Sequence, residues 1–142
     1  PALQAEAAAR GLDNILFHDP VGKRRLAGLL AGADLGMQIL ANVPAFYYGT
    51  SPNKFFDYIA AGLPVLNNYP GWLAEMIAEA ECGFAVPPDD PHAFADALKA
   101  AANDRGALNR MGANAARLAE QRFDRAILAD QWVAWVTEGK RL

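Results

Sequence analysis

Residues 49–66, with the sequence GTSPNKFFDYIAAGLPVL, constrain the fold of this chain more than any other stretch. Ser51 and Pro52 are typical of a helix start, with the serine as N-cap and the proline in the first turn. Gly62 is a typical helix stop, and residues 64–67 that follow, apolar except for Asn67, predict a buried strand. A helix at 53–61 followed so closely by a buried strand indicates an α/β fold.

The same alternation of helices and strands extends over residues 2–86. The sequence predicts further helices at 2–10, 22–31 and 72–80 and further strands at 14–17, 34–40 and 83–86. Later residues show helices only, at about 91–103, 106–121 and 124–138. Strands that alternate with helices form parallel sheets with right-handed crossovers. The predicted fold is therefore α/β, a Rossmann-like parallel sheet with flanking helices and a helical carboxyl-terminal tail.

The length of 142 residues suits one domain, which we predict to span residues 1–142. The chain opens directly in a helix and has no initiating methionine. Four predicted strands are few for a doubly wound sheet, which usually has about five or six. We therefore expect a fragment of a larger protein whose upstream strands are missing, with a small natural domain as the alternative.

Composition excludes several classes of function. A net charge of −3 without any run of lysines or arginines argues against a nucleic-acid partner. No segment reaches the roughly 18 apolar residues of a membrane span and no signal peptide opens the chain, so we expect a cytoplasmic protein. The single cysteine, Cys82, lies in an apolar run and predicts a buried structural thiol. No group of side chains has metal-ligand spacing, so we predict no metal site.

The start of the helix at 53–61 is the most specific candidate for a binding site. Ligands of open α/β sheets lie beyond the carboxyl ends of the strands, where the loops 18–21, 43–54 and 67–72 are predicted to lie. The amides of Asn53 and Lys54 are left free at the helix start. A lysine there costs on the order of 0.3–1 kcal/mol because the helix end is itself positive. A bound anion would reverse that sign, so the segment predicts a phosphate site.

Other polar and aromatic residues near this segment have two interpretations each. Asp57, on the same helix face as Lys54, either forms a surface ion pair with that lysine or accepts hydrogen bonds from a ribose diol. The aromatic residues 46–48 either stack on a sugar or base, or pack in the protein. His18 follows a predicted strand and is a candidate general acid–base group, whereas His92, in a helix first turn, is interpreted as solvated surface.

The last predicted helix carries an apolar stripe formed by Leu128, Trp132, Trp135 and Val136 at helical spacing. The stripe either packs in the core of this domain or docks on a further domain. In the second case the isolated chain would expose its tryptophans or form dimers through them.

Four blocks of the chain, in this order and spacing, resemble the carboxyl-terminal half of retaining GT-B glycosyltransferases of the group 1, or family 4, type. The blocks are GLDNILF at 11–17, LLAGADL at 29–35, SPNKFFDYIAAGLPV at 51–65 and CGFAVPP at 82–88. The resemblance covers about residues 1–138 and is greatest to bacterial enzymes that build surface polysaccharide or lipopolysaccharide. It implies the donor-binding domain of a two-domain enzyme, without the first strands of that domain.

The resemblance also assigns residues to the nucleotide-sugar donor. It implies that the diphosphate lies on Ser51, Pro52, Asn53 and Lys54, and that Asp57 takes the place of a glutamate that holds the ribose hydroxyls. The segment 17–21, which includes Phe17 and His18, falls where the base is usually contacted. Many relatives carry two glutamates eight positions apart, but this sequence has Gly49 at the first position and the shorter Asp57 at the second.

The resemblance implies an enzyme that transfers a sugar from a nucleotide diphosphate sugar, with a UDP-sugar favoured, to a carbohydrate or lipid-linked acceptor. No cofactor and no metal are implied, and the fragment alone is expected to be inactive without its amino-terminal acceptor domain. The whole enzyme is expected to be cytoplasmic or peripheral at the inner face of the membrane. Two alternatives remain: a nucleotide-binding module without catalysis, and a GT-B-like sugar-nucleotide epimerase, for which only His18 offers an acid–base group.

Overall fold

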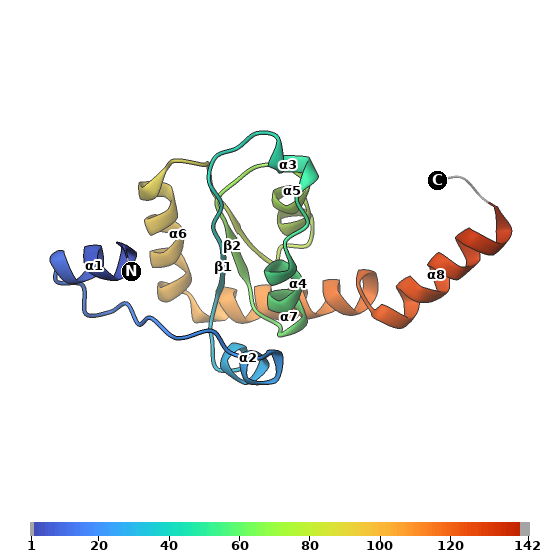
Figure 1. The fold of residues 1–142 in the computed structure, drawn as a ribbon, viewed down its shortest axis with the longest axis horizontal. Coiled ribbons are helices and arrows are strands. Elements are labelled where there is room, and N and C mark those ends of the chain that lie inside the picture. The colour runs from blue at the N-terminus through green and yellow to red at the C-terminus, as the bar shows by residue number, and fades with distance from the viewer. Residues whose placement is uncertain (1, 140–142) are drawn as a thin grey trace.

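The computed structural model describes residues 2–139 and has a parallel three-stranded sheet at its centre (Figure 1). The strands are β1 (Gly36–Gln38), β2 (Val65–Asn67) and β3 (Gly83–Ala85), paired in the order β1-β2-β3. Gly36 pairs with Val65 and Val65 with Gly83, so the three strands start at the same level. The predicted α/β fold with a parallel sheet is confirmed.

Helices occupy most of the remaining described chain. They are α1 (Ala2–Ala9), α2 (Lys23–Leu30), α3 (Phe46–Gly49), α4 (Asn53–Ala60), α5 (Trp72–Glu79), α6 (Pro91–Asn103), α7 (Arg105–Arg122) and α8 (Arg125–Glu138). The seven predicted helices are confirmed to within two residues at each end, the usual uncertainty of helix boundaries. The short α3 lies within the stretch 43–54 that we expected to be a loop.

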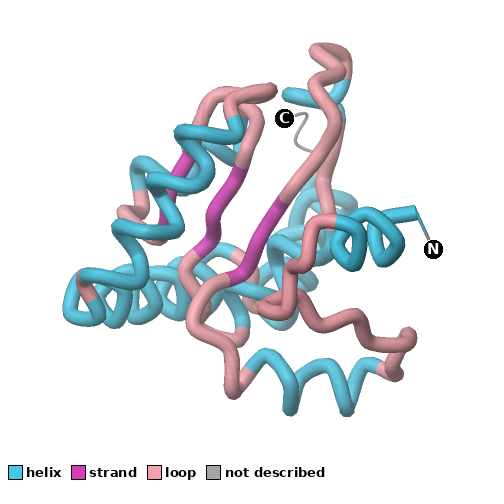
Figure 2. Tube along the Cα trace, turned by 90° about the vertical axis from the view of Figure 1, so that its left-hand side faces the viewer, coloured by secondary structure: helices cyan, strands magenta, loops and turns pink. Residues whose placement is uncertain are grey.

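The helices lie in layers on the sheet. Figure 1 shows α4 and α5 on one side of the strands and α6 on the other, with α7 running past their amino-terminal ends. The core lies on the α4 and α5 side, where Phe55, Ile59 and Leu73 are fully buried against Val65 of β2. The opposite side is more open, since Met37 of β1 is 44% exposed. Figure 2 shows the same sheet from the α6 side.

The predicted strand at 14–17 is absent, which is a correction to the expected four strands. In the segment between α1 and α2 no residue is in a strand, and Leu16 is 78% exposed. A strand exists only through hydrogen bonds to a neighbouring strand. None of the described strands lies beside this segment (Figures 1 and 2), so its apolar run has no ladder to join. The described sheet therefore has three strands.

Local signals in the sequence place several helix ends as expected. Gly62 adopts a φ of +69° directly after α4, which confirms it as the helix stop. The carboxylate of Asp90 accepts a hydrogen bond from the Ala93 amide at 2.9 Å, so the predicted cap of α6 is also confirmed. Cys82 is fully buried, and burial raises its pKa to about 11, in line with a structural thiol. His92 is exposed, as predicted.

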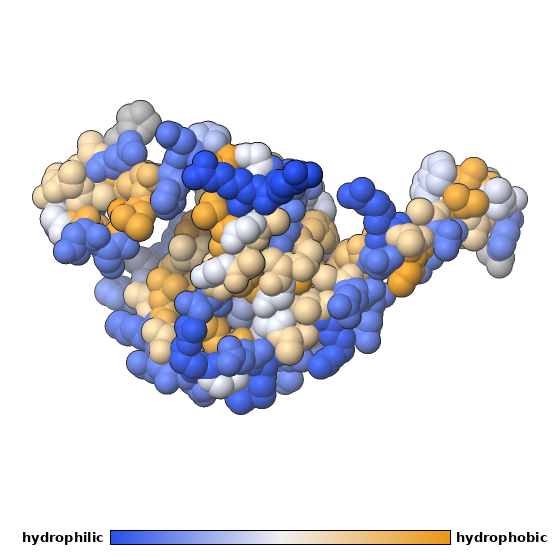
Figure 3. All heavy atoms as spheres, turned by 90° about the horizontal axis from the view of Figure 1, so that it is seen from below, coloured by the Kyte–Doolittle hydropathy of each residue, from blue (hydrophilic) through white to orange (hydrophobic). Residues whose placement is uncertain are grey.

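Helix α8 stands away from the rest of the molecule. None of its residues is buried, and Trp132 and Trp135 are 62% and 45% exposed. The space-filling view in Figure 3 shows this helix as an arm with apolar patches on its surface. The expectation that its apolar stripe packs in the core of this domain is therefore wrong, because its four residues are 43–62% exposed. Docking on a further domain stays a prediction.

Candidate functional site

The start of α4, the predicted phosphate site, lies on the open surface of the molecule. Asn53 is the first helical residue, and Pro52 before it is extended, with φ −77° and ψ 122°. No side chain caps the helix, so the expectation that Ser51 is the N-cap is wrong. The reason is geometric: because Pro52 lies outside the helix, Ser51 is one residue too early to reach the free amides. Ser51 is exposed and Pro52 is half-buried.

Two backbone donors remain free at this helix start. The amide of Phe55 donates to the carbonyl of Pro52 at 3.0 Å, but the amides of Asn53 and Lys54 have no acceptor among the described residues. Lys54 is exposed and has no carboxylate within ion-pair distance in residues 2–139. Two unpaired amides, the positive end of a helix and a free ammonium therefore meet at one exposed turn, which is a suitable arrangement for an anion.

Asp57 forms an ion pair that the sequence did not predict. The Lys23 ammonium on α2 lies 2.9 Å from each carboxylate oxygen of Asp57 on α4. The expected alternative, an ion pair between Asp57 and Lys54, is therefore wrong. The side chain of Asp57 is 32% exposed and that of Lys23 is 77% exposed, so this ion pair contributes only about 0–1 kcal/mol to stability. It nevertheless joins two helices that are far apart in the sequence.

The aromatic residues 46–48, which lie before α4, form most of α3 and differ in how far they are exposed to solvent. Phe46 and Tyr48 are 51% and 70% exposed, whereas Tyr47 is half-buried against the core. The Tyr48 hydroxyl donates to the Glu75 carboxylate at 2.8 Å, and that hydrogen bond raises the pKa of Tyr48. Of the two interpretations, packing applies to Tyr47, while Phe46 and Tyr48 present ring surface to solvent. Gly49 ends α3 in open space.

Two contacts hold α3 above the start of α5, as Figure 1 shows. Gly71, the residue before α5, has a φ of +107°, and a Cβ atom there would lie 2.0 Å from the carbonyl oxygen of Tyr47. Only glycine permits both this conformation and this approach. The indole of Trp72 donates to the carbonyl of Thr50 at 2.9 Å, which fixes the chain between α3 and α4. The free amides of α4 therefore follow a well-anchored loop.

Phe17 and His18 are not brought to the start of α4. Both lie in the exposed segment between α1 and α2, which in Figure 1 runs on the side where the strands begin. No cavity is lined by either residue together with residues 51–57 among the cavities found. The expectation that His18 reaches the ligand edge depended on a strand at 14–17, and that strand is absent. The described chain therefore does not offer His18 as an acid–base group beside Lys54.

A cavity of about 470 Å³ lies beyond the carboxyl ends of the strands, and sequence reasoning did not single it out. Its lining includes Ile39, Asn68 and Asp89, which follow β1, β2 and β3, together with residues of α6. The amide side chain of Asn68 bonds both the N–H and the carbonyl of Leu40, at 2.8 and 2.9 Å. Asn42 donates to the Asp89 carboxylate at 2.7 Å. These polar groups hold the loops together, and the rule that ligands bind beyond the strand ends would have found them.

The last residues of β1 and β2 bury polar atoms at the same edge of the sheet. Gln38 and Asn67 are fully buried neighbours, and Tyr69 follows them. The Asn67 amide donates to the carbonyl of Tyr69 at 2.5 Å. The Gln38 amide atoms, the Asn67 carbonyl oxygen and the Tyr69 hydroxyl make no hydrogen bond of ordinary geometry within the described chain. Buried polar atoms are nearly always hydrogen-bonded. The unpaired polar atoms at this edge of the sheet therefore suit a hydrated or ligand-binding site.

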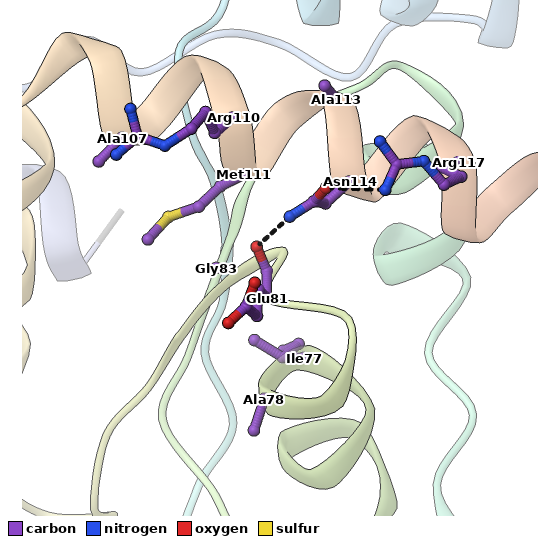
Figure 4. Close-up of a pocket in the computed structure, with 10 residues that line it drawn as sticks. All are labelled: Ile77, Ala78, Glu81, Gly83, Ala107, Arg110, Met111, Ala113, Asn114 and Arg117. Carbon is purple, nitrogen blue, oxygen red and sulfur yellow. Dashed lines mark hydrogen bonds between the residues drawn. The ribbon is translucent and has the colours of Figure 1, made fainter.

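Another cavity, of about 760 Å³, lies at the opposite edge, between the end of α5 and α7. Figure 4 shows that Arg110 and Arg117 both extend toward the amino-terminal end of α7, so that the Arg110 guanidinium lies near Ala107 and the Arg117 guanidinium lies near Asn114. Asn114 between them donates to the carbonyl of Glu81 at 3.1 Å. Because the two guanidinium groups do not converge, this cavity lacks the arrangement that would hold an anion.

Residues 2–139 contain neither a metal-binding cluster nor a membrane-spanning helix. No group of three or more His, Cys, Asp or Glu side chains is arranged to hold a metal ion. Likewise, none of the described helices combines the length and the apolar character needed to cross a bilayer.

Comparison with known proteins assigns the chain to a family. The family described as Glycosyl transferases group 1 matches residues 1–104, which include α4 and the three strands. A D-inositol 3-phosphate glycosyltransferase of Streptomyces avermitilis is 35% identical over 124 residues, 83% of this chain and 24% of that protein. One of the same name from Xylanimonas cellulosilytica is 35% identical over 116 residues, 78% of this chain and 25% of that protein. The chain thus spans about a quarter of the length of these relatives, and it belongs to the glycosyl transferases group 1 family.

Proposed function

We propose that residues 1–142 form the donor-binding domain of a retaining glycosyltransferase. The whole protein would transfer a sugar from a nucleotide diphosphate sugar, with a UDP-sugar favoured, to a carbohydrate or lipid-linked acceptor. A second domain outside this chain would bind the acceptor, in the cytoplasm or at the inner face of the membrane. Membership of the glycosyl transferases group 1 family supports sugar transfer from a donor.

One observation carries the proposal: the exposed first turn of α4 has two amides without acceptors and a lysine without an ion-pair partner among residues 2–139. A pyrophosphate offers the acceptor oxygens and the negative charge that this turn lacks. Ser51 and Pro52 shape the approach to the turn, and Asn53 and Lys54 supply the donors. Asp57, about one helical turn further on, would then face the ribose.

The same residues would assist the reaction through electrostatics. Negative charge develops on the leaving nucleoside diphosphate as the bond to the sugar breaks. Fixed amide dipoles and the ammonium of Lys54 would stabilise that charge without reorganisation at the moment of reaction. They accelerate transfer only if they bind the developing diphosphate more tightly than the intact donor.

The acceptor has two candidate classes. The resemblance to enzymes of surface polysaccharide and lipopolysaccharide synthesis favours a carbohydrate or lipid-linked acceptor. The name of these relatives, D-inositol 3-phosphate glycosyltransferase, favours a phosphorylated cyclitol instead. An assay of the whole protein with both acceptor classes and the same donor separates them, because only the correct acceptor yields a glycosylated product.

Binding of nucleotides to the isotope-labelled chain tests the proposal directly. We expect UDP, or GDP if the base is guanine, to shift the NMR signals of the amides of Asn53 and Lys54 in a saturable manner. Uridine without phosphate is the matched control and should leave these two amides unchanged. If UDP and GDP both leave the amides of residues 51–57 unmoved at millimolar concentration, the start of α4 is not a donor site.

A further inference from the structure

We propose that Lys23 is a positioning residue for donor recognition, which holds the Asp57 carboxylate ready for the vicinal diol of the donor's ribose. This inference rests on the proposed function, because it assumes that a nucleoside diphosphate binds along α4. It adds a residue from α2, an element that neither the motif at 51–57 nor the comparisons connect with the donor.

The geometry of the ion pair leaves both carboxylate oxygens of Asp57 able to accept a further hydrogen bond. Its two oxygens lie at the same distance, 2.9 Å, from the Lys23 ammonium. An ionised carboxylate has about four lone-pair positions, and this ammonium occupies one on each oxygen. One position therefore remains on each oxygen. A vicinal diol donates two hydrogen bonds from neighbouring hydroxyls, so it matches what the ion pair leaves free.

The helices α2 and α4, which carry Lys23 and Asp57, are only loosely packed against each other around this ion pair. A cleft of about 320 Å³ separates α2 from α4, and it is lined on the α2 side by Leu26 and Leu30 and on the α4 side by Ala60 and Ala61. Helix α2 has no buried residue, so packing holds it only weakly against α4. The ion pair itself lines this cleft, with Lys23 at the first residue of α2 and Asp57 in the middle of α4, and it bridges the two helices.

Stability alone gives no account of this pair. An exposed lysine in water gains about 0–1 kcal/mol from such a contact. A carboxylate that is already oriented, by contrast, spares the ligand the entropy cost of fixing that side chain on binding. The main effect of Lys23 is therefore expected on ligand binding rather than on folding.

The spacing along α4 agrees with a nucleotide that lies on both sites. Lys54 and Asp57 are on the same helix face, about one turn of 5.4 Å apart. In a nucleoside diphosphate the ribose carries its first phosphate through a single methylene and oxygen, so the two groups are about one helical turn apart. A phosphate at the amides of α4 would therefore bring the diol to the Lys23–Asp57 pair.

The experiment compares UDP with 2′-deoxy-UDP, or the guanine pair if GDP is the ligand that binds, on four forms of the chain. The forms are the unchanged chain, Lys23→Ala, Lys23→Arg and the control Lys99→Ala, which breaks another exposed pair, that of Lys99 with Asp96 at 3.1 Å. Dissociation constants are measured by NMR at the amides of α4. Thermal unfolding is recorded for every form, and Lys23→Arg keeps the test open if Lys23→Ala does not fold.

We expect the unchanged chain to bind UDP at least about tenfold more tightly than 2′-deoxy-UDP, the change for one lost hydrogen bond to a charged group. In Lys23→Ala this ratio should fall to about two or less, in Lys23→Arg it should be largely kept, and in Lys99→Ala it should not change. A ratio that stays the same in Lys23→Ala, whether or not both affinities drop together, overturns the positioning role. If the unchanged chain binds neither UDP nor GDP, it is the proposed function that fails, and the two results are distinct.

Discussion

Replacement of Lys54 by alanine should change donor binding and stability in opposite directions. The ammonium is exposed and has no ion-pair partner in the described chain, so its removal breaks no native contact. It does remove a cation from the positive end of α4, where a lysine costs about 0.3–1 kcal/mol. Alanine is also the best helix former. The free energy of unfolding of the empty domain should therefore rise by about 0.3–1 kcal/mol.

Donor binding should weaken in the same variant. A hydrogen bond to a charged group contributes about 1.5–3 kcal/mol, so the dissociation constant for UDP should increase by roughly tenfold to 150-fold. The loss should shrink in high salt, because the site is exposed and salt screens it within a Debye length of about 10 Å at 0.1 M. In the whole enzyme kcat/KM should fall by a similar factor, since the same ammonium faces the leaving diphosphate.

Chemical denaturation and nucleotide titration of one preparation measure both effects. Lys99→Ala is the matched control, because Lys99 is an exposed helical lysine far from α4 in sequence, and neither quantity should change beyond a few tenths of a kcal/mol. Unchanged UDP affinity in Lys54→Ala would refute the phosphate role. A loss of stability would refute the argument that the lysine is electrostatically misplaced in the empty helix.

Three other predictions concern the fold around the site. Gly71→Ala should destabilise the domain by at least about 1–3 kcal/mol in thermal unfolding, because its Cβ would lie 2.0 Å from the carbonyl oxygen of Tyr47 and φ is +107°. The control Gly28→Ala, in open space within α2, should stabilise the domain by about 0.5–1 kcal/mol. Equal effects of the two substitutions would contradict the packing of α3. Cys82 should not react with a thiol reagent at pH 8 until the protein unfolds. Because the pKa of its thiol is raised from 9.0 to about 11 in the folded protein, the stability that it contributes below pH 9 should be lost as the pH rises to 11. Cys82→Ala should lack this loss. The emission of Trp132 and Trp135 should be typical of solvent-exposed indole and quenched by iodide in the isolated chain; protection from iodide in a monodisperse monomer would show that α8 packs on this domain after all.

Most of the secondary structure follows from local signals in the sequence. The stop at Gly62, the cap at Asp90 and the alternation of apolar and polar positions act within a few residues, and the structure has these features where they are expected. The same kind of signal identified the free amides of Asn53 and Lys54. It misplaced the N-cap of α4 by one residue, because either Ser51 or Pro52 can precede a helix and only the backbone conformation of the proline decides between them.

What only the tertiary structure decided were the contacts between segments distant in sequence. The apolar residues 14–17 are not a strand, because no described strand lies beside them, and a strand is defined by its neighbour. The partner of Asp57 is Lys23, 34 residues earlier, and no spacing rule within α4 points to it. The sequence by itself thus determined the helices and the free amides at the start of α4, since these depend on neighbouring residues. The packing of α2 and α4 determined which charges meet, because such contacts depend on how the helices are arranged in space.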